Sequence, residues 1–434
     1  MSIKSFQTII FSALLGVWFP FPGIPQDWTP VQIDSLLQTN HIFKNSIHTV
    51  QLHKAGWELS YPVMELGSDD RLVLSFDELS GDVGDYYYTF FHCDATWNRS
   101  EIMETDYLDG FSDNQVTKYA YSFNTTVPYI HYELSFPNED LNFRISGNYI
   151  LMVYEGYDKN KPVLTRRFMV VENLVNVQAL LSRSSRTRYR ETGQEIQVTV
   201  RHPRYQVFDP YQEIDVVITQ NGRWDNAVLF DRPSFVRTGE LVYDFDERNI
   251  FMGGNEYRRF DIQSIRYQTE FVQHIDFSHP YYHIALFPVE AKPGRAYFSE
   301  QDLNGRYYIK IQEGLHSPTE ADYVKVYFTL KRPFPFSSGE VYVFGALSDW
   351  YCSWKNHLIY NYDAHAYETS MLLKQGYYNY AFVVKEPGRM LADNTLIEGS
   401  HYQTENDYQV FVYHRAAGSR YDRLVGYAAM NTVH

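Results

Sequence analysis

The residues best suited to chemistry stand in a short run, His92-Cys93-Asp94, which follows an aromatic stretch that begins at Tyr86. A thiol beside an imidazole and a carboxylate has the composition of a nucleophile–base pair. Neighbouring residues of a strand point to opposite faces, so His92 and Cys93 should diverge and the imidazole should not reach the thiol. We therefore expect the strand to end here, with Asp94 capping a turn and Trp97 packing on it.

Two further motifs resemble chemical sites but lack the residues that would complete them. His279 and His283 stand four apart, which would suit zinc on a helix, but Pro280 argues against a helix and no third ligand accompanies them. The segment Gly253–Asp261 opens like a phosphate loop without Gly-Lys-Ser/Thr, and we interpret it as a structural polar network. We predict no catalytic residue, no metal and no cofactor. A thiol or metal hydrolase centred on Cys93 or His283 is the least favoured alternative.

Strand patterns dominate the rest of the chain, and helical periodicity is weak. The aromatic share is 17%, with Tyr 38 and Phe 29, and these residues favour strands. Short runs with alternating or continuous apolar residues, separated by turn signals, predict β-sandwiches. The runs are 71–76, 148–154, 195–200, 214–219, 324–330 and 341–344. The predicted fold is all-β, with three consecutive immunoglobulin-like β-sandwich domains.

The predicted organisation places an exported leader before these domains. Lys4 and the apolar run from Ile9 to Phe19 are typical of a signal peptide, and the run is too short to span a membrane comfortably. The prediction is a signal peptide at 1–23, a lead-in arm at 24–43, and sandwiches at 44–173, 174–331 and 332–434. No later segment approaches the length of a membrane span, so the mature chain should act outside the cytoplasm without a spanning segment.

Charge and cysteine content narrow the function further. The formal net charge of −15 argues against nucleic acid, because binding there depends on neutralising phosphates. Only Cys93 and Cys352 are present, and they fall in different predicted domains. A bridge between distant cysteines rarely meets the required geometry, so we expect each to be a small buried hydrophobe.

Two segments are candidate partner-binding surfaces. The first is a basic run in an acidic protein, whose guanidinium groups suit an acidic partner; it contains Arg183, Arg186, Arg188 and Arg190. The second follows the strand at 341–344 with a glycine turn and Asp349-Trp350. The strand, the glycine turn and Asp349-Trp350 together resemble the beginning of the early-set, carbohydrate-binding immunoglobulin-like domains of glycogen-branching enzymes. By that resemblance Trp350, Tyr351 and Trp354 could form an aromatic platform, for a sugar or for a protein.

Taken in order along the chain, the motifs resemble one family, the plug protein of the Bacteroidetes type IX secretion system. They cover nearly the whole predicted mature chain. The segments are 92–97, 109–111, 119–137, 146–149, 253–261, 345–350, 374–380, 398–402 and 404–408.

The resemblance implies a non-enzymatic periplasmic protein associated with the outer membrane. Such a protein seals the periplasmic mouth of a giant β-barrel translocon when no cargo is crossing, and we expect a monomer bound one per barrel. The family offers no established catalytic residues to transfer to this sequence. The alternative function is a periplasmic glycan-binding or glycan-processing accessory protein.

Overall fold

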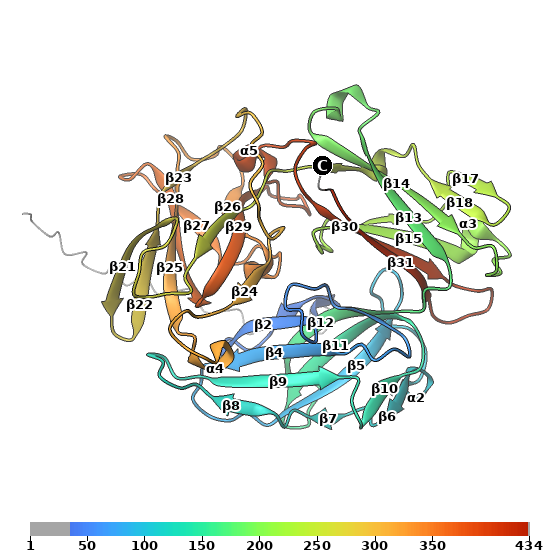
Figure 1. Ribbon diagram of the computed structural model, residues 1–434, viewed down its shortest axis with the longest axis horizontal. Coiled ribbons are helices and arrows are strands. Elements are labelled where there is room, and N and C mark those ends of the chain that lie inside the picture. The colour runs from blue at the N-terminus through green and yellow to red at the C-terminus, as the bar shows by residue number, and fades with distance from the viewer. Residues whose placement is uncertain (1–34, 433–434) are drawn as a thin grey trace, which may run out of the picture.

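The computed structural model of the chain describes residues 35–432, and strands are by far the commonest regular element among them. The predicted all-β fold is confirmed. Figure 1 shows three units, each built around its own core: an N-terminal unit at the bottom, a middle unit at the right and a third unit at the left. The predicted signal peptide, and the arm up to residue 34, lie outside the described residues.

The N-terminal unit encloses its core between two sheets. The first contains β1 (His41–Ile42), β12 (Pro162–Val171), β11 (Gly147–Glu155), β5 (Tyr86–Cys93) and β7 (Asn114–Gln115), with β3 (Val63–Glu65) parallel to β12. The second contains β2 (Ile47–Lys54), β4 (Leu72–Glu78), β9 (Ile130–Phe136) and β8 (Tyr119–Tyr121). A small outer sheet pairs β6 (Leu108–Gly110), which follows α2 (Glu104–Tyr107), with β10 (Leu141–Phe143).

The two sheets of this unit differ in how many of their faces are covered. Along β9 buried residues alternate with half-buried ones, and Tyr132 stacks on Phe76 with ring centres 4.9 Å apart. Along β11 every residue except Glu155 is buried. A strand buried on both faces needs a second layer outside the sheet, so the pattern of β11 predicts a partner layer beyond this unit.

The middle unit also encloses its core between two sheets. The first contains β13 (Asn176–Arg183), β14 (Gly193–Arg201), β18 (Glu240–Tyr243), β17 (Phe235–Arg237) and β19 (Ile250–Met252). The second contains β16 (Val228–Phe230), β15 (Ile214–Gln220), β30 (Asp407–His414) and β31 (Arg423–Asn431). Short helices lie in its loops: η1 (Thr187–Tyr189), α3 (Pro210–Glu213) and η2 (Glu247–Asn249).

The third unit is a ten-stranded sheet whose two halves pack on one shared core. One half contains β20 (Arg258–Asp261), β29 (Gly376–Lys385), β26 (Glu340–Phe344) and β24 (Tyr307–Ile309). The other contains β28 (Ala366–Lys374), β25 (Tyr323–Lys331), β22 (Tyr281–Leu286), β21 (Val272–Ser278) and β23 (Val289–Glu290), and β27 (His357–Asn361) joins the halves. Its short helices are α4 (Ser317–Glu320), η3 (Ala346–Ser348) and α5 (Thr395–Glu398).

The strand pairing departs from the consecutive domains that the sequence predicts. The predicted C-terminal domain, 332–434, includes β30 and β31, yet β30 pairs with β15 of the middle unit. The predicted middle domain, 174–331, includes β20 to β25, and these belong to the third unit's sheet. Local sequence patterns identify strands but do not show which strands pair. Consecutive elements are neighbours in space only about two-thirds of the time. The pairing of β15 with β30 joins strands that are almost 190 residues apart in the chain. The predicted arm differs too, since His41–Ile42 pairs with β12.

Candidate functional site

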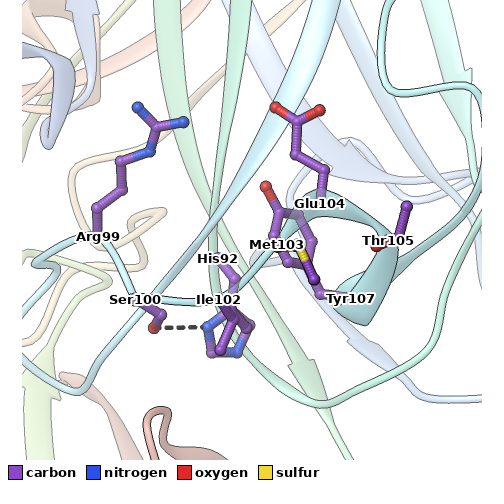
Figure 2. A pocket seen from close by; sticks show the side chains of 8 residues that line it. All are labelled: His92, Arg99, Ser100, Ile102, Met103, Glu104, Thr105 and Tyr107. Carbon is purple, nitrogen blue, oxygen red and sulfur yellow. Dashed lines mark hydrogen bonds between the residues drawn. The ribbon is translucent and has the colours of Figure 1, made fainter.

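His92 and Cys93 do not form a nucleophile–base pair. The Ser100 hydroxyl donates to His92 Nδ1 over 2.8 Å (Figure 2), and Nε2 donates to the Ser146 carbonyl oxygen over 3.1 Å. Burial lowers the pKa of His92 to about 4, which makes it a weak base at neutral pH. Burial raises the pKa of the Cys93 thiol to about 12, so the thiol stays protonated and unreactive.

The residues after Cys93 form a turn that contacts the middle unit. The Asp94 carboxylate accepts from the backbone N–H of Thr96 and of Asn98, each over 2.9 Å, which confirms the predicted turn. The Ala95 N–H donates to Asp422 over 2.8 Å. The 92–97 motif is therefore a structural joint between two units.

Trp97 anchors this joint and is 3% exposed. Its ring meets Trp224 of the middle unit edge to face, with centroids 4.7 Å apart, and the Arg167 guanidinium lies 4.4 Å from the ring centre. The predicted packing of Trp97 is thus directed across the joint and not only onto its own turn. Aromatic pairs of this geometry contribute energy beyond the area they bury.

Around Trp97 the joint is a continuous apolar layer, which we call the apolar joint. Buried side chains from the outer face of the first sheet of the N-terminal unit pack against the outer face of the sheet that holds β15, β30 and β31. They include Phe91, Ile150, Met152, Val217, Phe411 and Leu424. This layer is the covering that the fully buried β11 requires.

The N-terminal and third units meet through charges, in what we call the polar joint. Asp77 of β4 and Lys374 of β28 are each 1% exposed and lie 2.6 Å apart. The same carboxylate accepts from the Tyr323 hydroxyl over 2.6 Å and lies 2.7 Å from His131 Nδ1. A polar cavity of about 440 Å³ between the two units is lined by these charges and by His53.

Electrostatics decide the state of this buried carboxylate. Burial pushes the pKa of Asp77 upward, but Lys374 and His131 outweigh burial, so the pKa lies below its ordinary value of 3.8. The Lys374 ammonium also donates to the Pro318 carbonyl oxygen over 2.6 Å and lies 4.2 Å from the centre of the Tyr129 ring. Asp77 is therefore ionised and fully paired at neutral pH.

The third and middle units are joined by the 253–261 and 398–408 motifs. A Cβ on Gly253 would stand 2.0 Å from the His401 carbonyl oxygen, so the close approach of the two segments requires glycine. The Arg258 guanidinium donates to Glu398 over 2.9 Å. That pair lies within the third unit. Across the joint, Asn255 donates to the Glu398 carbonyl oxygen over 2.9 Å, and Ser400 donates to the Thr192 carbonyl oxygen of the middle unit over 2.8 Å. The predicted polar network is therefore present and continues between the two units.

One side chain connects all three units. Arg306 of the third unit donates to the Leu59 carbonyl oxygen of the N-terminal unit over 2.6 Å and to Asp407 of β30 over 2.9 Å. Its guanidinium lies 4.8 Å from the centre of the Tyr61 ring, and the Tyr61 hydroxyl donates to Asp407 over 2.8 Å. The three units form a closed set of contacts, in which each touches the other two.

The three residues of the predicted aromatic platform differ in exposure, since Trp350 is half-buried and the other two are exposed. Trp350, at a positive φ of 58°, packs on Phe344 with ring centroids 5.5 Å apart, and the guanidinium of Arg223 from the middle unit lies 5.5 Å from its ring. Tyr351 and Trp354 are 56% and 71% exposed. Trp350 is half-buried at a joint and packs on the protein's own side chains, whereas Tyr351 and Trp354 face solvent.

The predicted basic surface is partly engaged with the protein itself. Arg183 pairs with Glu191 and lies 4.4 Å from the centre of the Tyr402 ring. Arg188 pairs with Glu247. Arg186 and Arg190 are exposed beside them. The run therefore presents fewer free guanidinium groups to a partner than its sequence suggests.

The histidine pair does not build a metal site. His283 lies on β22 with Nδ1 2.7 Å from the Tyr327 hydroxyl. Among residues 35–432, no cluster of His, Cys, Asp or Glu has the arrangement of a metal site.

Within the same residues, no helix has the length and apolar character needed to cross a bilayer. Cys352 is half-buried and Cys93 is buried, and both are free thiols.

Sequence reasoning missed the charges of the polar joint. Lys374 ends β28 directly after the apolar run Met371–Leu373, and Asp77 follows Phe76 near the end of β4, so a charge at the end of a strand is the available signal. Nothing local indicates that the two charges meet, because they lie almost 300 residues apart in the chain.

The fold and its joints define a class: an all-β protein in which polar motifs lock one unit to the next. Residues 47–172 match the family model of the type 9 secretion system plug protein 1st domain. The fold also resembles the crystal structure of a hypothetical protein from Parabacteroides merdae ATCC 43184, at 33% identity and a TM-score of 0.88, covering 91% of this chain and 99% of that one. None of the curated proteins compared matches. The chain belongs to the type 9 secretion system plug protein family.

Proposed function

We propose that this protein is a periplasmic plug, which binds the outer-membrane translocon barrel of the type IX secretion system and seals its periplasmic opening when no cargo crosses. The proposal rests on the positions, at the joints between units, of the sequence motifs by which the chain resembles the plug family. The 92–97, 253–261, 345–350 and 398–408 segments lie at joints and fix three units into one body. A protein that seals an opening benefits from a fixed shape, because units that moved relative to one another would lose conformational entropy each time they bound.

The surface chemistry is compatible with such a partner. The interiors of outer-membrane barrels are commonly polar, and this protein is acidic overall and rich in tyrosine. Tyrosine offers contact area together with a polar hydroxyl, which allows binding without irreversible apolar adhesion. The proposal includes a periplasmic location and one copy of the protein per barrel.

The first experiment is affinity purification of the tagged mature protein from detergent-solubilised envelopes, with mass spectrometry of the co-purifying proteins. We expect one giant outer-membrane barrel protein in near-equal amount. A protein that purifies alone would contradict the proposal.

A second experiment separates sealing from mere binding. Deletion of the gene should increase the entry of a bulky hydrophilic dye across the outer membrane, and expression of the wild-type protein should reverse the increase. Unchanged dye entry after deletion, in a strain whose wild-type parent shows the protein bound to the barrel, would contradict the sealing role.

A further inference from the structure

One family-type motif, Asp109-Gly110-Phe111, takes no part in the joints described above. Gly110 has φ 108°, and a Cβ there would stand 2.0 Å from the Asp140 carbonyl oxygen, so only glycine fits. The Phe111 N–H donates to that same oxygen over 3.2 Å, and Asn114 donates to the Phe111 carbonyl oxygen over 2.8 Å. The backbone on both sides of Phe111 is therefore fixed.

This fixed backbone presents an apolar ring to solvent. Phe111 is 72% exposed, and Met103, at the start of α2 in the same segment, is 69% exposed. Figure 1 places α2, β6 and β10 at the edge of the N-terminal unit, away from the third unit. Preorganised exposed apolar side chains favour binding, because little entropy remains to be lost.

A pocket lies in the same segment. Its volume is about 440 Å³, and its lining combines the apolar and aromatic surfaces of Ile102 and Tyr107 with the carboxylate of Glu104. Figure 2 shows Arg99 on one side of the pocket and Glu104 and Tyr107 on the other. Glu104 lies 3.7 Å from Lys159, so the charges at the pocket are matched within the protein and the pocket adds apolar surface beside Phe111.

The charge around these residues is acidic. The exposed carboxylates of Glu101, Asp106, Glu139 and Asp140 have no ion-pair partner among the described residues, whereas nearby Asp109 is paired with Arg144. Such a surface repels the anionic headgroups of a membrane and attracts a basic protein surface.

We propose that the segment 101–111, together with Glu139 and Asp140, docks a basic periplasm-facing segment of the translocon barrel. Phe111 inserts into an apolar recess of that segment, and the exposed carboxylates of Glu101, Asp106, Glu139 and Asp140 pair with its lysine or arginine side chains. The inference rests on the proposed plug function and names the surface that carries it out.

The test compares variants in the purification from solubilised envelopes, with the barrel protein identified and quantified by mass. Phe111→Ser should reduce barrel recovery about tenfold, as removal of a central aromatic anchor does. Phe298→Ser is the matched control, because Phe298 is 73% exposed on the third unit, and it should leave recovery unchanged. Melting curves should show that both variants fold like the wild type.

The charge contribution has its own test. Glu101→Lys/Glu139→Lys should reduce barrel recovery several-fold and weaken its dependence on salt, while Asp69→Lys/Asp363→Lys on other exposed loops should not.

The outcomes separate this inference from the proposed function. If wild-type protein and Phe111→Ser recover the barrel equally, the docking surface is wrong and the plug function stands. If the wild type recovers no barrel, both fail. Binding of wild-type protein, but not Phe111→Ser, to phosphatidylethanolamine–phosphatidylglycerol vesicles would overturn the protein partner in favour of lipid.

Discussion

The N-terminal unit is held on two sides by opposite kinds of chemistry. At the apolar joint, Trp97, Phe411 and Leu424 belong to one buried layer shared with the middle unit. At the polar joint, Asp77 and Lys374 are paired beside a cavity. Apolar burial responds little to pH or salt, whereas a charged contact fails when one partner is removed or neutralised. The polar joint is therefore the more sensitive of the two to pH and to the substitution of a single residue.

The largest expected effect is at the polar joint. Lys374→Met leaves the Asp77 carboxylate buried without its cation, so the free energy of unfolding should fall by about 3–5 kcal/mol. Urea unfolding followed by tryptophan fluorescence measures the change. The double variant Lys374→Met/Asp77→Asn should recover most of the loss, because no uncompensated charge remains. A double variant as unstable as the single one would show that packing, not charge, holds this joint.

A smaller effect is expected at the apolar joint. Leu424 is fully buried, so Leu424→Ala should lower the free energy of unfolding by about 3 kcal/mol through lost burial and a residual cavity. The same urea experiment, repeated at low and at high salt, distinguishes an apolar contact from a charged one. The loss should be the same at both salt concentrations, and a marked salt dependence would contradict the apolar character of the joint.

Acid should act mainly on the polar joint. The pKa of Asp77 is lower in the folded protein than its ordinary 3.8, so its pairing stabilises the fold above that value and the contribution is lost as pH falls below it. Calorimetry from pH 7 to pH 3 should show a larger fall in Tm for the wild type than for Lys374→Met/Asp77→Asn. If Tm falls equally with pH in the wild type and in the double variant, the acid sensitivity does not come from Asp77.

The smallest effect is expected from the one thiol in the apolar joint. Cys93→Ala removes a small buried group, so it should lower the free energy of unfolding by about 1 kcal/mol and leave barrel recovery unchanged. If Cys93→Ala melts like the wild type but recovers less of the barrel protein, the thiol takes part in function, contrary to this prediction.

Much of the fold could be predicted from local patterns, and the joints could not. The alternation in 71–76 and 195–200 correctly predicts strands, and Asp94 begins a turn as expected. The packing of Trp350 was not predictable in this way, because it involves a left-handed backbone at that residue and Arg223 from another unit. Such contacts arise between segments far apart in the chain, which periodicity does not report.

The pairing of β15 with β30 also has a consequence for the order in which the protein is made. The second sheet of the middle unit takes β15 and β16 from before the third unit and β30 and β31 from after it. A chain interrupted after residue 400 would contain every strand of the other two units and only half of that sheet. Since the missing strands also supply Phe411 and Leu424, a polypeptide made from its N-terminus onward should gain its final architecture only with its last thirty residues. Slight C-terminal truncation should therefore be far more damaging than its length suggests.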